Sequence, residues 1–135
     1  MPRSNSKAVI VVEDDVSVSH ALVRVLRLGG LEPVAYPSAE AFLDEAGEFQ
    51  AICLIIDIQL PGMSGFALRE RLADSRALPP VVFMTAYDEP ESRERAAAAG
   101  AVAFLAKPFS GRALLEIIEK EANLPPGELH KGTFE

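Results

Sequence analysis

Residues 51–65, "AICLIIDIQLPGMSG", contain six apolar residues that run directly into one carboxylate, Asp57, and then into a Pro-Gly turn. The apolar run lacks the alternation of a strand with one wet face. Such a run is typical of a strand that is buried on both faces of a parallel sheet. A buried strand is a rigid support, so the sequence predicts that this strand holds Asp57 at the floor of a crevice.

Three more short apolar runs occur along the chain, at 8–12 ("AVIVV"), 81–84 ("VVFM") and 101–105 ("AVAFL"). They predict further buried strands of the same sheet. A fifth segment, "PVAYP" at 33–37, carries a proline at each end. Because proline lacks the backbone donor that a central strand needs, this segment is expected at a sheet edge.

Helical patterns separate these runs. Ser38, Ser64 and Ser110 are expected to cap the second, third and fifth helices, and the fourth covers about residues 90–99. Gly29-Gly30 is expected to end the first helix. One face of that first helix is predicted to be apolar and comprises Val18, Ala21, Leu22, Val25 and Leu28.

The order of these elements is βαβαβαβαβα, which predicts an α/β fold. Right-handed crossovers would give a doubly wound five-stranded parallel sheet with the strand order 2-1-3-4-5, as in a flavodoxin-like (βα)5 fold. We expect one domain over residues 1–123. Residues 124–135, "LPPGELHKGTFE", are predicted to be a linker or a frayed end, because they hold two prolines, two glycines and little apolar pattern.

Composition narrows the class of protein. A chain of 135 residues suits a single core. Its formal net charge of −7 opposes binding to nucleic acid by this chain alone and to anionic membranes. The single cysteine, Cys53, forms no internal disulfide. The apolar stretch near the N-terminus is too short for a signal-peptide core or a membrane span, so we expect a cytoplasmic protein.

Polar side chains follow the predicted strands at the edge of the sheet where ligands bind in such folds. Each one alone has an ordinary explanation as a turn or cap residue, and Asp14 or Asp15 can cap the first helix. Together, several carboxylates in one crevice repel one another and favour a bound cation. The residues concerned are Glu13, Asp14, Asp15, Asp57, Thr85 and Lys107.

The donor types indicate the chemistry of this crevice. Oxygen ligands without sulfur or imidazole suit Mg²⁺ rather than zinc. Lys107 adds a second positive charge. A metal ion, an ammonium and a hydroxyl around a carboxylate form a receptor for a phosphoryl group, and an aspartate can act as the nucleophile that receives it.

Four motifs carry a family resemblance over about residues 7–122. The sequence resembles the receiver domain of bacterial two-component response regulators in four stretches, which are "VIVVEDD" (9–15), "LIIDIQLPGMSG" (54–65), "VVFMTAYD" (81–88) and "AFLAKPF" (103–109). The resemblance implies that Asp57 accepts a phosphoryl group from a sensor histidine kinase. It also implies a Mg²⁺ site made by Glu13, Asp14, Asp57 and the backbone carbonyl of Gln59.

The resemblance further implies how the signal leaves the site. Thr85 and Lys107 would contact the phosphoryl group, the ring of Phe104 would rotate together with Thr85, and Pro108 would follow a cis peptide bond. The face made by the fourth helix, the fifth strand and the fifth helix would then switch toward an output domain or partner protein, with a homodimer as one form. Such a chain is a phosphoacceptor signalling domain that assists its own phosphorylation and slow dephosphorylation, rather than an enzyme.

Two departures leave alternatives open. The first acidic residue is Glu13, where the family often has Asp, and Gln59 and Tyr87 occupy positions that influence the loss of the phosphoryl group. A phosphohydrolase with an aspartate nucleophile would need an acid where Gln59 stands. A flavodoxin-like cofactor binder would need a phosphate loop where the chain has "EDDVS". A receiver-like interaction module that works without phosphorylation remains the main alternative.

Overall fold

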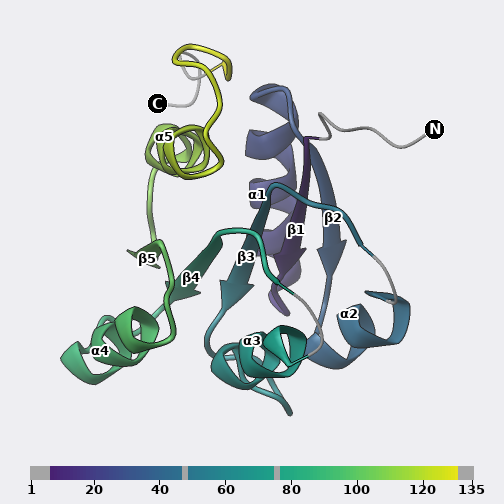
Figure 1. Cartoon of the computed structure of the whole chain (residues 1–135), viewed down its shortest axis with the longest axis vertical. Coiled ribbons are helices and arrows are strands. Elements are labelled where there is room, and N and C mark those ends of the chain that lie inside the picture. Colours follow the sequence, from purple (N-terminus) through teal and green to yellow (C-terminus); the bar gives the residue numbers. More distant parts are fainter. Residues whose placement is uncertain (1–6, 47–48, 75–76, 131–135) are drawn as a thin grey trace.

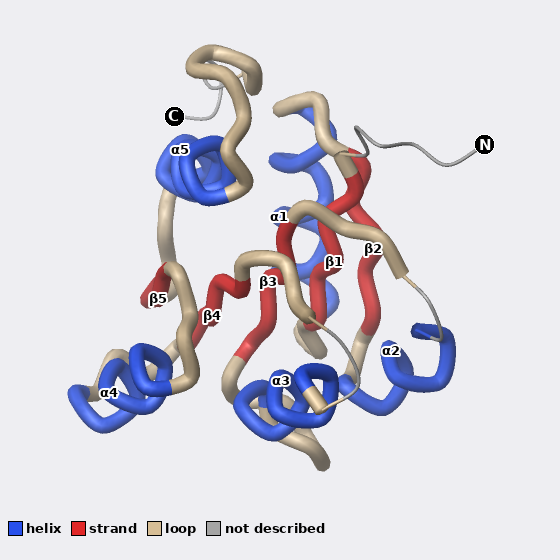
Figure 2. The backbone as a smooth tube through the Cα atoms, viewed as in Figure 1, coloured by secondary structure: helices blue, strands red, loops and turns tan. Residues whose placement is uncertain are grey.

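The computed structural model describes residues 7–46, 49–74 and 77–130, in which five strands alternate with five helices (Figures 1 and 2). The strands are β1 (Ala8–Val12), β2 (Glu32–Tyr36), β3 (Cys53–Asp57), β4 (Val81–Thr85) and β5 (Ala103–Ala106). The helices are α1 (Val16–Leu28), α2 (Ala39–Ala46), α3 (Gly65–Ala73), α4 (Pro90–Ala98) and α5 (Gly111–Glu121).

All strand pairs are parallel, and the strand order is β2-β1-β3-β4-β5. The predicted doubly wound sheet is therefore confirmed, including the edge position of β2. The segment bounds differ slightly from the prediction. β3 begins at Cys53 rather than at residue 51 and includes Asp57, while β5 begins at Ala103 rather than at residue 101.

Successive strand residues point to opposite faces of the sheet, and both faces are covered. Val9, Val11 and Ile55 pack with α1 and α5, whereas Ile10 and Ile56 pack with α2, α3 and α4. Figure 1 shows the same arrangement, with α1 and α5 on one side of the sheet and α2, α3 and α4 on the other. This two-sided burial is the reason why the central strands read as continuous apolar runs.

The predicted apolar face of α1 is wrong at Ala21, which is exposed, and at Leu28, which is 49% exposed, whereas Leu26 is fully buried. Leu28 lies six residues after the buried Leu22, which corresponds to about 600° of helix rotation, or roughly 120° from Leu22 around the axis. The predicted helix caps are confirmed. Ser38, Ser64 and Ser110 each accept a backbone N–H at 3.0–3.1 Å, and Asp15 caps α1.

The segment after α5 differs from the predicted linker or frayed end. Residues 124–130 fold back over α5 and the end of α1, and the side chain of Leu129 is buried among residues of both helices. The backbone N–H of Leu129 donates to the Glu119 carboxylate at 3.2 Å, and that of His130 donates to the carbonyl of Gly29 at 3.2 Å. Lys7 and Glu128 form an ion pair. Residues 131–135 of the predicted tail lie outside the described residues, and the role of the segment as a linker stays a prediction.

We expect Leu129→Ala to lower the free energy of unfolding by about 2 kcal/mol, because the substitution leaves a cavity between α1 and α5. The value lies at the low end for a buried leucine, since a segment that is held by a few contacts can detach locally. Urea unfolding followed by circular dichroism measures the change. Leu28→Ala, the same substitution at an exposed position, is the control and should change the stability by less than about 0.5 kcal/mol. Equal stability of both variants would mean that residues 124–130 do not anchor the fold.

Cys53 lies on β3 and is 1% exposed. Burial, together with the charge of Glu121, raises the pKa of its thiol to about 12. Because only the thiolate reacts, a disulfide reagent should leave the native protein unmodified at mildly alkaline pH and should label one thiol per chain in denaturant. Absorbance of the released thiol reports the reaction. Rapid labelling of the native protein would show that β3 is open to solvent.

None of the helices in the described part of the chain is both long enough and apolar enough to cross a lipid bilayer.

Candidate functional site

Asp57 is the last residue of β3 and is only 3% exposed. Parallel pairing places it opposite Met84 of β4, and Thr85 opposite Ala106 of β5. Glu13 follows β1 directly, and its side chain is fully buried. The carboxyl ends of three adjacent strands, β1, β3 and β4, thus deliver these polar groups to one edge of the sheet, as the sequence predicted, and Lys107 follows β5 at the same edge.

Gly65, a residue whose role the sequence analysis missed, holds the end of β3 in place. Its backbone N–H donates to the carbonyl of Ile58 at 3.1 Å. A Cβ atom at Gly65 would lie 2.4 Å from the Asp57 carbonyl oxygen, a distance that no side chain permits. Glycine therefore lets α3 begin directly against the backbone that carries Asp57. The available signal was a glycine immediately after the capping Ser64, at the start of an otherwise regular helix.

Lys107 joins two buried carboxylates. Its ammonium donates to Oε1 of Glu13 at 2.7 Å and to Oδ2 of Asp57 at 2.9 Å. The side chain of Glu13 has no exposed surface, and that of Asp57 is 4% exposed. The peptide bond between Lys107 and Pro108 is cis, in agreement with the resemblance. One cation that lies between two carboxylates neutralises part of the negative charge of this edge.

Burial and the hydrogen bond between Glu13 and Lys107 act in opposite directions on the pKa values of both residues. Burial raises the pKa of Glu13, and the negative charge of Asp57 acts in the same direction, although hydrogen bonds from Lys107 and Asp15 oppose it. For Lys107, burial favours the neutral amine, but the hydrogen bonds to Glu13 and Asp57 outweigh it and raise the pKa. Lys107 is therefore charged at neutral pH, and the acidic groups still repel one another.

Three carboxylates fit a divalent cation. Glu13, Asp14 and Asp57 each offer one oxygen, and these oxygens lie within 4.8 Å of one another. Asp14 is exposed, so the group opens to solvent on one side. An oxygen-only donor set with room for water suits Mg²⁺. The extra methylene of Glu13 therefore does not remove it from the cluster, and the backbone carbonyl of Gln59 as a further ligand stays a prediction.

Thr85 is fully buried, and its hydroxyl binds neighbours other than Asp57. Its Oγ1 lies 2.8 Å from Oε1 of Gln59 and 3.0 Å from the carbonyl of Tyr87, and its single proton donates to one of these two acceptors at a time. The backbone N–H of Tyr87 donates to the same hydroxyl at 2.9 Å. The sequence predicted that Gln59 offers its backbone carbonyl to the metal and influences the loss of the phosphoryl group, but the contact of its side chain with Thr85 was not predicted.

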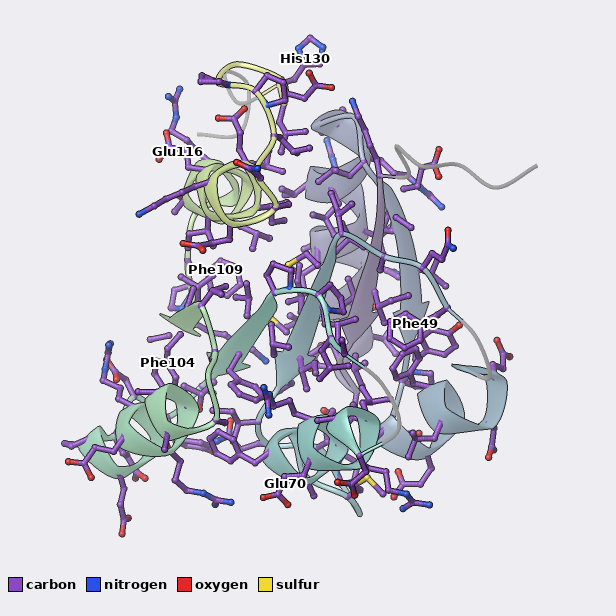
Figure 3. The ribbon with its side chains drawn as sticks, viewed as in Figure 1. Phe49, Glu70, Phe104, Phe109, Glu116 and His130 are labelled. Carbon is purple, nitrogen blue, oxygen red and sulfur yellow. The ribbon has the colours of Figure 1, made fainter. Side chains whose placement is uncertain are left out.

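Phe104 lies on β5 beside α4 (Figure 3). Its ring is half-buried, and the guanidinium carbon of Arg93 lies 4.9 Å from the ring centroid. Asp88 accepts two hydrogen bonds from Arg93, at 2.6 and 2.9 Å. Along α4 itself, Ala96 is the buried residue. The helix next to Phe104 is therefore attached by little apolar area.

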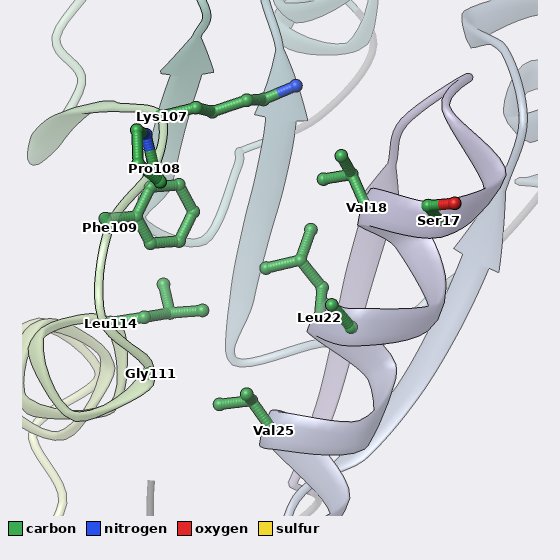
Figure 4. A pocket seen from close by; sticks show the side chains of 10 residues that line it. Ser17, Val18, Leu22, Val25, Lys107, Pro108, Phe109, Gly111 and Leu114 are labelled. Carbon is green, nitrogen blue, oxygen red and sulfur yellow. The ribbon is translucent and has the colours of Figure 1, made fainter. Parts of the chain in front are cut away.

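A groove of about 320 Å³ opens beside the site, between α1 and the chain that leads into α5 (Figure 4). Lys107 lies at one end of it, and the opposite end reaches Val25. The side chains between these ends are mainly apolar, and they include Val18, Leu22, Phe109 and Leu114. The groove was not predicted, because its walls come from residues about ninety positions apart.

Comparisons with known proteins agree with this geometry. Residues 9–119 match the family model of the response regulator receiver domain. The chain is 37% identical to Nodulation protein W of Bradyrhizobium diazoefficiens over 116 residues, which are 85% of this chain and 51% of that protein. It is 33% identical to the transcriptional regulatory protein FixJ of Rhizobium meliloti, over 82% of this chain and 54% of that protein. The chain therefore spans about half the length of these relatives.

Solved structures give the same result. A response regulator receiver protein from Burkholderia phymatum is 36% identical, with a TM-score of 0.78 over 89% of this chain and 98% of that one. A CheY-like receiver domain protein from Methanospirillum hungatei is 27% identical, with a TM-score of 0.81 over 88% of this chain and 95% of that one. The fold, the grouped strand-end residues and these matches lead to one conclusion: the chain belongs to the response regulator receiver domain family.

Proposed function

We propose that this receiver accepts a phosphoryl group on Asp57 from a phosphohistidine of a sensor histidine kinase, in a reaction that requires Mg²⁺. The observation that carries the proposal is the pairing of Lys107 with both buried carboxylates, at 2.7 Å from Glu13 and 2.9 Å from Asp57. A lysine in this position is ready to bind the oxygens of a phosphoryl group on Asp57.

The transfer step balances without a further reactant. An oxygen of the Asp57 carboxylate attacks phosphorus, a P–O bond forms, and the P–N bond to the kinase histidine breaks. The electron pair of that bond returns to the imidazole nitrogen, which takes up a proton from water. The product on this chain is an aspartyl-phosphate.

Negative charge on the transferred group must be matched during this step. Lys107 supplies one positive charge through its ammonium. When Mg²⁺ is bound, it supplies further positive charge to the phosphoryl oxygens. Glu13 and Asp14 would hold the ion together with Asp57, and the carbonyl of Gln59 is the proposed fourth protein ligand. The oxygens of the three carboxylates lie within 4.8 Å of one another, which is close enough to bind one ion.

The proposed response involves the face made by α4, β5 and α5. Thr85 would leave its present partners and turn toward the phosphoryl group, and Phe104 would rotate with it. The small buried area of α4, limited to Ala96, supports this proposal, because weakly packed elements shift at low cost. The switched face would contact an output domain or partner protein, or a second copy of the chain.

We propose that the kinase docks at the groove shown in Figure 4. Asp57 is nearly buried, so a donor histidine must approach it through the loops at this edge of the sheet. The groove adjoins Lys107 and has an apolar lining, which a helical surface of a partner can cover. The cytoplasmic location, the signalling rather than enzymatic role and the absence of direct nucleic-acid contacts stay predictions.

One observation favours the alternative of an interaction module that works without phosphorylation. The hydroxyl of Thr85 already has hydrogen-bond partners in Gln59 and Tyr87, so this part of the site is saturated without a phosphoryl group. Such a module would keep the acidic cluster and the fold but would respond to binding alone.

Incubation with acetyl phosphate and Mg²⁺, followed by intact-mass measurement, separates the two functions. The proposed receiver should gain the mass of one phosphoryl group, and a chelator should prevent the gain. A chain that stays unmodified with Mg²⁺ present would support the interaction module instead.

A further inference from the structure

Gln59 contacts the proposed phosphoacceptor and the proposed switch residue at the same time. Its backbone N–H donates to Oδ1 of Asp57 at 2.8 Å. Its side-chain Oε1 accepts from the hydroxyl of Thr85 at 2.8 Å and, more weakly, from the backbone N–H of Ala86 at 3.4 Å. One exposed side chain thus bridges the carboxyl ends of β3 and β4.

The hydroxyl of Thr85 and the N–H of Ala86 meet at the Gln59 amide oxygen. Both donors lie at the end of β4, which pairs with the strand that carries Asp57. A phosphoryl group on Asp57 would bring three strongly accepting oxygens into the same crevice. The hydroxyl of Thr85 has only one proton, and its lone pairs already accept from the N–H of Tyr87. That proton has two acceptors within reach, Oε1 of Gln59 at 2.8 Å and the carbonyl of Tyr87 at 3.0 Å, and the shorter distance is the one to Gln59. Thr85 therefore cannot donate to a phosphoryl oxygen while it donates to Gln59.

We infer that the amide oxygen of Gln59 occupies, in the unphosphorylated domain, the donors that a phosphoryl oxygen on Asp57 would use, so that Gln59 lowers the affinity of the site for a phosphoryl group by direct competition. The inference rests on the proposed function and adds a regulator to it. Gln59 is a positioning residue, because it acts through Thr85 and Ala86. An exchange of one acceptor for another also explains how the buried Thr85 stays satisfied in both states.

Beryllofluoride tests the competition apart from phosphoryl lifetime. It coordinates a carboxylate oxygen and presents three accepting fluorines in place of phosphoryl oxygens, and there is no acyl phosphate to hydrolyse. With Mg²⁺ present, Gln59→Met should lower the Kd for beryllofluoride about 2- to 10-fold, the range that one neutral hydrogen bond supports. Fluorine NMR and the amide signal of Ala86 measure the binding.

Two further variants make the test specific. Gln50→Met makes the same change at an exposed position before β3 and should leave the Kd unchanged. Gln59→Ala should shift the Kd in the same direction as Gln59→Met, since both lack the accepting oxygen. In a Thr85→Val background, the gain from Gln59→Met should shrink to less than about 2-fold, because the shared donor is gone. Thermal unfolding verifies that each variant is folded.

The outcomes separate the two ideas. If the wild-type chain binds beryllofluoride and Gln59→Met binds it with equal or lower affinity, the competition is overturned while the proposed function stands. If neither chain binds it in the presence of Mg²⁺, both the proposed function and the inference fail. A gain that persists unchanged in the Thr85→Val background would also overturn the inference, since Gln59 would then act by another route.

Discussion

Asp57→Asn should abolish the gain of a phosphoryl group from acetyl phosphate. The substituted amide is nearly isosteric with the carboxylate. In Asp57 the backbone N–H of Gln59 donates to Oδ1 at 2.8 Å and the Lys107 ammonium donates to Oδ2 at 2.9 Å, and the single amide oxygen of asparagine keeps one of these two hydrogen bonds. The amide lacks the negative charge that makes the carboxylate oxygen a nucleophile. We therefore expect a folded variant with no detectable adduct in the intact mass at any time of incubation.

The matched control is Asp44→Asn, the same change at an exposed position of α2. It should gain one phosphoryl group at the wild-type rate. An adduct that persists in Asp57→Asn would assign the acceptor to another residue, and peptide mass spectra of the variant would identify that residue. Loss of the adduct in both variants would instead indicate that the reaction depends on the overall acidic charge.

Lys107→Met should cause the largest loss of stability among these variants. The change keeps most of the aliphatic stem but removes the only ammonium that contacts Glu13 and Asp57 among the described residues. Two buried carboxylates would then face each other without a counter-charge. Removal of one partner of a buried ion pair typically costs about 3–5 kcal/mol, so we expect a decrease of this size in the free energy of unfolding at neutral pH without metal.

The pH dependence of this loss identifies its cause. The pKa of Glu13 is raised in the folded chain above its ordinary value of 4.5, mainly by burial. The protonation of Glu13 therefore stabilises the fold fully below about pH 4.5, and this stabilisation is lost as the pH rises through the raised pKa. Without Lys107 the pKa of Glu13 rises further, so the deficit of Lys107→Met should shrink as the pH is lowered toward about 5.

Urea unfolding at both pH values, with and without Mg²⁺, measures these effects. Mg²⁺ should restore part of the lost stability, because it supplies positive charge to the same carboxylates. Lys120→Met on the exposed face of α5 is the control and should change the stability by less than about 0.5 kcal/mol. A deficit that is the same at both pH values would mean that Lys107 contributes by packing rather than by charge.

Much of the fold follows from local pattern. The continuous apolar runs predicted strands that are buried on both faces, and the prolines around β2 predicted its edge position. From the resulting strand order, the meeting of Glu13, Asp57, Thr85 and Lys107 follows without any knowledge of side-chain contacts. These features were predictable because hydrophobic burial and parallel pairing depend on residue type and period, which the sequence states directly.

Other features depended on contacts between distant segments. The return of residues 124–130 onto α1 and α5 rests on Leu129 and a few backbone hydrogen bonds, which have no periodic signal in the sequence. The groove beside Lys107 requires α1 and α5 to be a certain distance apart.

The sequence by itself therefore determined the sheet, its order and the set of groups at its edge, because each of these follows from burial and strand pairing. Only the tertiary structure decided which of those groups bind one another. Lys107 contacts Glu13 and Asp57, while Thr85 contacts Gln59, 26 positions away in the chain. The physical reason is that a hydrogen bond depends on distances of a few tenths of an ångström, and these are set by the packing of the whole domain rather than by any local stretch of residues.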